Sequence, residues 1–149
     1  MLGFGDKAYE YYRKINPIEH SKTKEQASKY KVEPYVISAD IYGVKNLKGR
    51  GGWTWYTGSS SWYYKAGIEN ILGLKIQNNV LKLSPVIPSE WKEYSIRYRY
   101  NLSTYNIKVS NPNSRIGEIT KIKLDGQIQE KNEVKLVDDG KIHEIEAEI

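Results

Sequence analysis

The pattern of hydrophobic and polar positions changes character near Gly73. Before it, apolar residues recur at helical spacing within segments that polar stretches separate. After it, they alternate in short runs bounded by turn residues, which is typical of β-strands. The pattern predicts an α+β chain of two units, residues 1–73 and 74–149.

Two helices are predicted in the first unit. Asp6 can cap a helix over Lys7–Ile15, because its carboxylate can accept from the first free backbone N–H groups. A second helix spans Ser60–Leu72 and ends at Gly73. Its residues are apolar on several faces, so we expect it to be buried on most sides.

More than forty residues, Asn16–Ser59, separate these helices. This is far longer than the roughly 12–15 residues common for a structureless connection, and long loops are often functional. Proline suits the first helical position, so a further helix can begin at Pro34, with Val36, Ile37 and Ile41 facing a core.

The second unit is predicted to be a set of short strands. Tyr94–Tyr100 and Tyr105–Val109 alternate apolar and polar residues and form a hairpin. The other predicted strands are Val80–Leu83, Ile119–Leu124, Glu133–Val137 and Ile142–Ile149. About six short antiparallel strands are typical of a β-sandwich.

The segment Gly49–Tyr64 is the candidate functional region. It holds three Trp and three Tyr within sixteen residues, together with glycines and a run of Ser. Glycines let backbone N–H groups approach a ligand, and a helix N-terminus can receive an anion. Aromatic rings can stack on sugars. The same aromatics could equally be core residues, and the Gly58–Ser61 run could be only a helix cap.

Composition narrows the classes of function. The chain has no Cys, and its two histidines, His20 and His143, are far apart, so we expect no metal centre and place both in loops or on the surface. The net charge is +5, but acidic and basic residues are interleaved, so we expect no nucleic-acid partner. No apolar run is long enough to span a membrane.

The chain resembles the C-terminal end of the glycoside phosphorylases of glycoside hydrolase family 94, and within it the cyclic β-1,2-glucan synthases. The run Gly49–Tyr56, with Ala39–Tyr42 before it, carries the second likeness. The family motifs, in order, are Gly5–Tyr12, Val32–Val36, Thr57–Ser59, Ile71–Leu74 and Pro85–Trp91. The likeness extends to about Asn111-Pro112 and then fades.

The resemblance implies that residues 1–73 are the last helices and an active-site loop of an (α/α)6 barrel, and that residues 74–149 are an antiparallel C-terminal β-sandwich. It implies inverting phosphorolysis in the parent enzyme, with phosphate in the role of the activated water. Thr57 and Gly58 match the family's phosphate-binding pair. In the family, the general acid and the other phosphate ligands precede the segment matched here, so we expect no catalytic residue in this chain and no activity from it alone.

Two functions are therefore in competition. The first is a C-terminal fragment of a β-glucan-processing phosphorylase, with inorganic phosphate as co-substrate and no cofactor; its partners are a β-linked glucan, phosphate, the upstream part of the barrel and further copies of the chain. We expect it in the cytoplasm, in a parent that can be attached to a membrane protein. The alternative is a non-catalytic carbohydrate-binding module, in which Trp53, Trp55 and Tyr56 stack on sugar.

Overall fold

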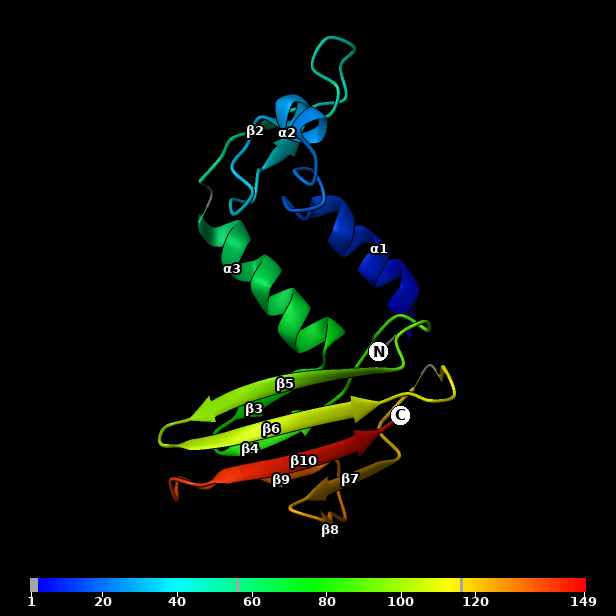
Figure 1. The fold of residues 1–149 in the computed structure, drawn as a ribbon, viewed down its shortest axis with the longest axis vertical. Helices are drawn as coiled ribbons and strands as arrows, with labels where there is room; N and C mark the ends of the chain where they lie inside the picture. Colours follow the sequence, from blue (N-terminus) through cyan, green and yellow to red (C-terminus); the bar gives the residue numbers. More distant parts are fainter. Residues whose placement is uncertain (1–2, 56, 116) are drawn as a thin grey trace. The chain divides into compact units, whose positions relative to one another are not determined.

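The computed structural model describes residues 3–55, 57–115 and 117–149. Within these ranges, helices lie in the first half and most strands in the second, so the chain is α+β as predicted (Figure 1). The chain forms two compact units. Unit 2 is Ala8–Gly67, and unit 1 joins the N-terminal residues through Lys7 to Ile68–Ile149.

Unit 1 contains two β-sheets. In the part of unit 1 that is described, a three-stranded sheet has the order β3-β4-β9, and a five-stranded sheet has the order β5-β6-β10-β7-β8. The strands are β3 (Leu74–Gln77), β4 (Val80–Leu83), β5 (Glu93–Tyr100), β6 (Ser103–Ser110), β7 (Lys121–Leu124), β8 (Gln127–Ile128), β9 (Glu133–Lys135) and β10 (Ile142–Glu148). All six predicted strands are present; β3 and β8 were not predicted.

The predicted hairpin is confirmed as β5 and β6. Tyr98 faces Tyr105 across the antiparallel pair. Asn101 makes the turn with φ of 51°, a left-handed conformation that asparagine tolerates better than most residues. Alternation places Tyr94, Ile96, Tyr98 and Tyr100 on the inner side of the sheet. The charged residues between them lie on the outer side.

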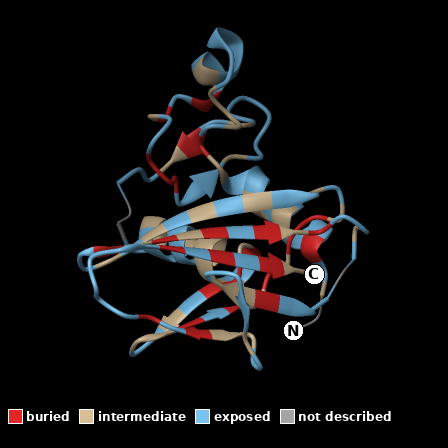
Figure 2. Cartoon of the chain, turned by 60° about the horizontal axis from the view of Figure 1, so that its bottom comes forward, coloured by how far each residue is buried: buried red, intermediate tan, exposed pale blue. Residues whose placement is uncertain are grey.

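One apolar core is shared by the two sheets of unit 1. Leu81 and Val134 enter it from the three-stranded sheet, and Tyr105, Ile107 and Ile145 from the five-stranded sheet; each is at most 1 % exposed. Figure 2 shows these buried positions as red bands that alternate along β6 and β10. Burial of alternate residues on both sheets is the main stabilising contribution to this unit.

The pairing of β6 with β10 is parallel, with His143 beside Tyr105 and Ile145 beside Ile107. The expectation of antiparallel strands throughout is wrong at this pair. A hairpin is fixed by a local turn, whereas β10 reaches β6 only after the chain has passed through β9 of the other sheet. Nothing in the local pattern encodes such a long-range pairing.

His143 is buried in β10, at 8 % exposure, so the prediction that it lies in a loop or on the surface is wrong. Its Nδ1 is 2.7 Å from Asp125 Oδ2, and its Nε2 is 3.1 Å from Asp139 Oδ1. The ring also stacks on Tyr105, with 4.8 Å between centroids. His143 shares the inner side of β10 with Ile145, and the two carboxylates satisfy both of its ring nitrogens.

These contacts couple the charges of three side chains. The hydrogen bond that His143 makes to the Asp125 carboxylate, followed by that to the Asp139 carboxylate, raises the pKa of His143 above its ordinary value, because both favour the imidazolium. The hydrogen bonds from the Lys141 N–H and from His143 lower the pKa of Asp139 to about 2. Asp125 and Asp139 lie in two different turns, so the two hydrogen bonds of His143 connect those turns.

The helices differ from the predictions in detail. They are α1 (Gly5–Ile15), α2 (Lys24–Tyr30), α3 (Thr57–Lys65) and the π-helix η1 (Ala66–Ile71), which continues α3. Asp6 lies in the first turn of α1, where its carboxylate accepts from the Ser89 N–H at 2.8 Å. Trp62 and Tyr64 of α3 are exposed, so the prediction that this helix is buried on most sides is wrong for this chain.

The helix predicted at Pro34 is absent, and the sequence analysis missed α2. The Val36 N–H donates to Glu33 O at 3.1 Å, which makes a turn, while Val36 and Ile37 are buried as expected. Ile41 is exposed in β1 (Asp40–Ile41). The signal for α2 is the Thr23–Gln26 capping box, in which each side chain accepts from the other residue's backbone N–H.

Gly73 connects η1 to β3 in unit 1. Its φ is +76°, and a Cβ built on it would overlap the backbone of Ser84 and Pro85. The Ser84 N–H also donates to Gly73 O at 2.9 Å, so the two backbones are in direct contact. Only glycine fits this position.

We expect Gly73→Ala to lower the free energy of unfolding by more than about 2 kcal/mol, since it adds a backbone collision to an unfavourable φ. Urea denaturation followed by circular dichroism measures the change. Gly140→Ala is the matched control, because Gly140 has φ of +74° and open space around its Cβ position. Equal losses from the two substitutions would mean that the close approach at Gly73 contributes nothing.

Stability should depend on pH through His143. The pKa of His143 is raised in the folded state, so its contribution is complete below the unfolded value of about 6.5 and is lost as pH rises through the folded pKa. We therefore expect the free energy of unfolding to fall as pH rises above about 6.5 in the native chain, and to change less in His143→Gln. An imidazole titration by NMR with a midpoint at or below the ordinary value would contradict this coupling.

Candidate functional site

The candidate site is carried by a short hairpin in unit 2. β1 pairs antiparallel with β2 (Gly51–Gly52), and Asp40 lies opposite Gly52. The hairpin is closed by the Tyr42 N–H donating to Arg50 O at 2.9 Å. At its far end the Ala39 N–H donates to Trp53 O at 3.1 Å, which fixes the start of the aromatic segment.

A small core supports this hairpin. Tyr30, Val32 and Val36 form a buried cluster within unit 2. A Cβ on Gly51 would collide with Val32, so the hairpin approaches this cluster more closely than any other residue would allow. The Tyr30 hydroxyl lies 3.1 Å from Ser38 Oγ, which satisfies both buried groups.

Two of the predicted sugar-binding residues extend from the hairpin into solvent. Trp53 is 66 % exposed and Trp55 is 63 % exposed. Both have left-handed backbone conformations, with φ of 52° and 65°, which bulky residues seldom adopt. Tyr56, the third predicted residue, lies outside the described residues. The structure therefore shows Trp53 and Trp55 as surface residues and not as core.

The predicted phosphate-binding pair lies where α3 begins. Thr57 is the first residue of α3 and Gly58 the second; the side chain of Thr57 lies outside the description. Gly58 is exposed, and a Cβ on it would meet open space. The first turn of α3 contains no acidic residue. The backbone N–H groups at the N-terminus of α3 and the helix dipole therefore favour an anion at this end.

Helix α3 is held against α1 within unit 2. The rings of Tyr12 and Tyr63 stack with centroids 4.0 Å apart, and the Tyr63 hydroxyl donates to Tyr12 O at 2.9 Å. Burial, and then the proximity of Tyr12, raises the pKa of the Tyr63 phenol. Gly67 lies beneath the Tyr12 ring, where a larger residue would collide with it. These contacts fix α3, and with it the N–H groups of its first turn.

Two titratable side chains of unit 2, Glu19 and His20, are bound by neighbouring residues of the same unit. Glu19 binds Arg13 and Lys22, both at 2.8 Å, and those hydrogen bonds lower its pKa to about 2. His20 is half-buried in a turn, with Nε2 2.7 Å from Lys14 O. Across residues 3–55, 57–115 and 117–149, no three His, Asp or Glu side chains are grouped as metal ligands. In the same ranges no helix has the length and apolarity to cross a membrane.

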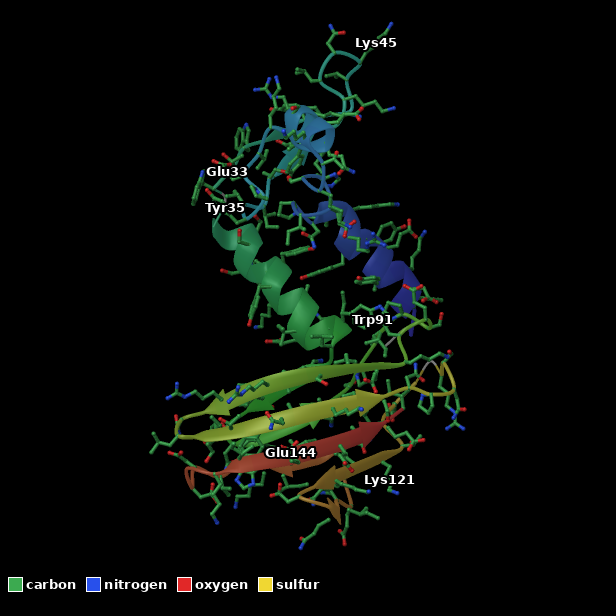
Figure 3. All side chains as sticks on the ribbon, in the orientation of Figure 1. Glu33, Tyr35, Lys45, Trp91, Lys121 and Glu144 are labelled. Atoms are coloured by element: carbon green, nitrogen blue, oxygen red, sulfur yellow. The ribbon has the colours of Figure 1, made fainter. Side chains whose placement is uncertain are left out.

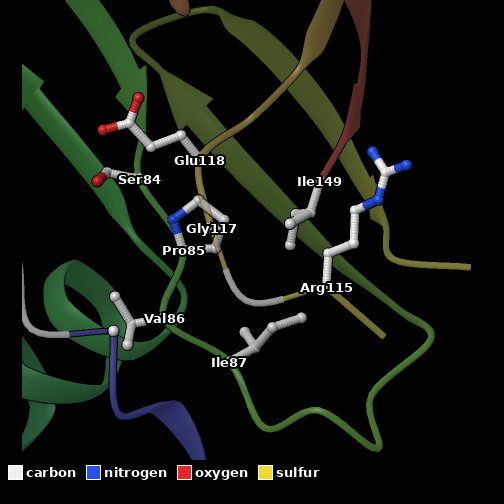
Figure 4. A pocket seen from close by; sticks show the side chains of 9 residues that line it. Ser84, Pro85, Val86, Ile87, Arg115, Gly117, Glu118 and Ile149 are labelled. Atoms are coloured by element: carbon white, nitrogen blue, oxygen red, sulfur yellow. The ribbon is translucent and has the colours of Figure 1, made fainter. Parts of the chain in front are cut away.

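Unit 1 contains a separate cavity of about 150 Å³, shown in Figure 4. Its lining includes Arg115, Glu118 and Ile149. Typical small-molecule sites are about 300–1,000 Å³, so this cavity is small for an oligosaccharide. None of the predicted site residues contributes to it.

One neighbour of the aromatic segment escaped the sequence analysis. Tyr35 is 74 % exposed, and its ring meets Trp55 edge to face, with centroids 6.2 Å apart. Twenty residues separate them in the sequence, and the helix predicted at Pro34 assigned Tyr35 to a regular element. The sequence analysis included Tyr35 only as a member of the family motif Val32–Val36 and gave it no role in binding.

Two segments of the chain match the sequences of known protein families. Residues 1–73 match the family model described as glycosyl hydrolase 94 superfamily, catalytic domain. Residues 74–128 match that of glycosyl hydrolase family 65, C-terminal domain. This second match is to another family model, and it extends past Asn111-Pro112, where the sequence analysis expected the family 94 pattern to fade.

The names of three individual relatives refer to three different sugars. The chain is 49 % identical to cyclic beta-(1,2)-glucan synthase NdvB of Rhizobium meliloti, over 76 % of this chain and 4 % of that protein. It is 32 % identical to N,N'-diacetylchitobiose phosphorylase of Vibrio furnissii, over 85 % of this chain and 16 % of that protein. It is 25 % identical to solabiose phosphorylase of Paenibacillus borealis, over 100 % of this chain and 19 % of that protein.

The chain spans less than a fifth of the length of each of these relatives. Its matched segments follow one another without overlap, the first ending at residue 73 and the second beginning at residue 74. Residues 1–73 are therefore similar to the catalytic domain of the glycosyl hydrolase 94 superfamily, and residues 74–128 to the C-terminal domain of glycosyl hydrolase family 65.

Proposed function

We propose that this chain is the C-terminal part of a glycoside phosphorylase that processes β-glucans, and that it supplies one wall of the phosphate and sugar site. The observation that carries the proposal is the position of Thr57 and Gly58 at the start of α3, within the segment that matches the catalytic domain. The glucan is inferred from the printed name of the Rhizobium meliloti relative.

In this proposal the chain binds phosphate but does not complete the reaction. The Thr57 hydroxyl and the Gly58 N–H donate to the phosphate, and the dipole of α3 favours its charge. Phosphate attacks the anomeric carbon with inversion while a general acid protonates the departing oxygen. No residue here matches the family's acid, so the upstream barrel supplies it. Phosphate is a co-substrate, and no cofactor is required.

The proposal includes the finer architecture. Helices α1 and α3 would be the last helices of an (α/α)6 barrel, followed by a β-sandwich. Two sheets around one core support the sandwich. The exposed side chains on α1 and α3, among them Tyr11 and Trp62, support a missing barrel partner. We place the protein in the cytoplasm, in a parent that can be attached to a membrane protein.

A second function is supported by the exposure of Trp53 and Trp55. A carbohydrate-binding module needs rings that solvent can reach, and it needs no general acid. The two functions differ in one requirement: a binding module acts without phosphate and without the upstream barrel.

The phosphorylase role can be tested by reconstitution. We expect phosphate-dependent release of glucose 1-phosphate from a β-1,2-glucan when the chain is mixed with the upstream barrel, and none from the chain alone. Thr57→Ala should lower that activity about tenfold to a hundredfold, because a donor to the anion is lost. Ser60→Ala, in the same helix, is the control. A folded mixture with no activity would reject the role, and full activity in Thr57→Ala would reject Thr57 as a ligand.

We expect copies of the chain to associate with one another when the upstream barrel is absent. Exposed side chains on α1 and α3 form apolar surface that a stable monomer seldom leaves uncovered. Light scattering of the chain alone at high concentration should give masses above the 17.2 kDa of one copy. Addition of the upstream barrel should reduce the self-association. A monomer at every concentration would contradict this expectation.

A further inference from the structure

We propose that Tyr35 and Trp55 form a two-ring platform that holds one pyranose ring of a β-glucan oligosaccharide. Tyr35 is thereby added to the aromatic residues that bind sugar, and the pair binds one pyranose ring of the oligosaccharide. The choice of a glucan rests on the proposed function, whereas the platform itself rests on the geometry of unit 2.

The two rings present a corner to solvent. Their planes are inclined at 67° and their centroids are 6.2 Å apart, so they touch edge to face without covering each other. Tyr35 is 74 % exposed and Trp55 is 63 % exposed, which leaves a broad face of each ring accessible. One ring can stack on the C–H face of a pyranose while the other contacts its edge.

The backbone at both residues holds the rings outward. In the turn at Tyr35, the next residue, Val36, enters the small core of unit 2, so the aliphatic side chain is buried and the aromatic one is not. Trp55 is held with φ of 65°, close to the paired strands of the hairpin. Strained conformations of this kind persist only where the surroundings enforce them, and they cluster at ligand sites.

The polar groups beside the rings suit a neutral sugar. The Tyr35 hydroxyl can both donate to and accept from a sugar hydroxyl. Glu33 lies two residues before Tyr35 in the same turn, and Figure 3 shows the two labelled side chains at the same edge of unit 2. Its carboxylate can accept from sugar hydroxyls. This combination of apolar ring faces with a few polar groups is common in sugar-binding surfaces.

Other exposed aromatics lack this arrangement. Trp62 is as exposed as Tyr35, but it lies on helix α3 with Lys65 Nζ 5.8 Å from its ring centroid. The cation occupies one face of that ring. Tyr64, 69 % exposed on the same helix, has no aromatic ring partner among the described residues. Trp62 and Tyr64 therefore serve as internal controls for exposure alone.

The test uses the 149-residue chain labelled with ¹⁵N at its indoles and titrated with a β-1,2-linked glucopentaose in the absence of phosphate. Trp55→Phe assigns the Trp55 Nε1–H signal. We expect that signal to shift saturably and the Trp62 signal to stay in place. Tyr35→Ala should weaken the apparent Kd about tenfold, and Tyr64→Ala should leave it unchanged. Unshifted signals from the other indoles show that each variant is folded.

Three results would overturn the platform: no shift at Trp55, a shift confined to Trp62, or equal weakening by Tyr35→Ala and Tyr64→Ala. The outcome is separable from that of the proposed function. Phosphate-dependent activity of the reconstituted mixture with a silent Trp55 would reject the platform alone. Saturable binding at Trp55 in a chain that never supports phosphorolysis would keep the platform and reject the phosphorylase role.

Discussion

The shared core of unit 1 is the constraint on which the rest of that unit depends. The chain has no Cys, so its stability comes from burial and from hydrogen bonds. Both sheets place alternate side chains in one cluster, and the backbones meet at Gly73, where no Cβ fits. That contact positions the loop that follows β4. In this loop the Ser89 N–H donates to the carboxylate of Asp6. This hydrogen bond joins Asp6 to that loop within unit 1.

Polar contacts fix the ends of the sheets where apolar packing is weakest. The Tyr105 hydroxyl donates to Val137 O at 3.1 Å and accepts from the Val137 N–H at 2.7 Å. Ser103 Oγ, fully buried, accepts from the N–H groups of Asp139 and Gly140. His143 then pairs with Asp139 and with Asp125 of another turn. Buried polar groups are stabilising only when each is satisfied, and the buried Tyr105, Ser103 and His143 each have a partner, two of them through the exposed carboxylates of Asp125 and Asp139.

Unit 2 combines a small core with an exposed aromatic hairpin. Three buried side chains support β1 and β2, and just beyond them Trp53 and Trp55 adopt backbone conformations that bulky residues avoid. Local preference and the observed structure conflict at these two positions. Natural proteins tolerate such conflicts mainly at functional sites. The same segment leads into the first turn of α3, so the aromatic side chains and the N-terminal N–H groups of α3 belong to one continuous stretch of chain.

The sequence by itself determined the α+β class, the β5–β6 hairpin and the extent of β4, because two-residue alternation and turn residues are local signals. It also directed attention to Trp53, Trp55 and Gly58. The parallel pairing of β6 with β10, the burial of His143 and the meeting of Tyr35 with Trp55 were decided only by the tertiary structure. Each of them joins residues far apart in the chain, and the free energy that favours the contact exists only once both partners are in place.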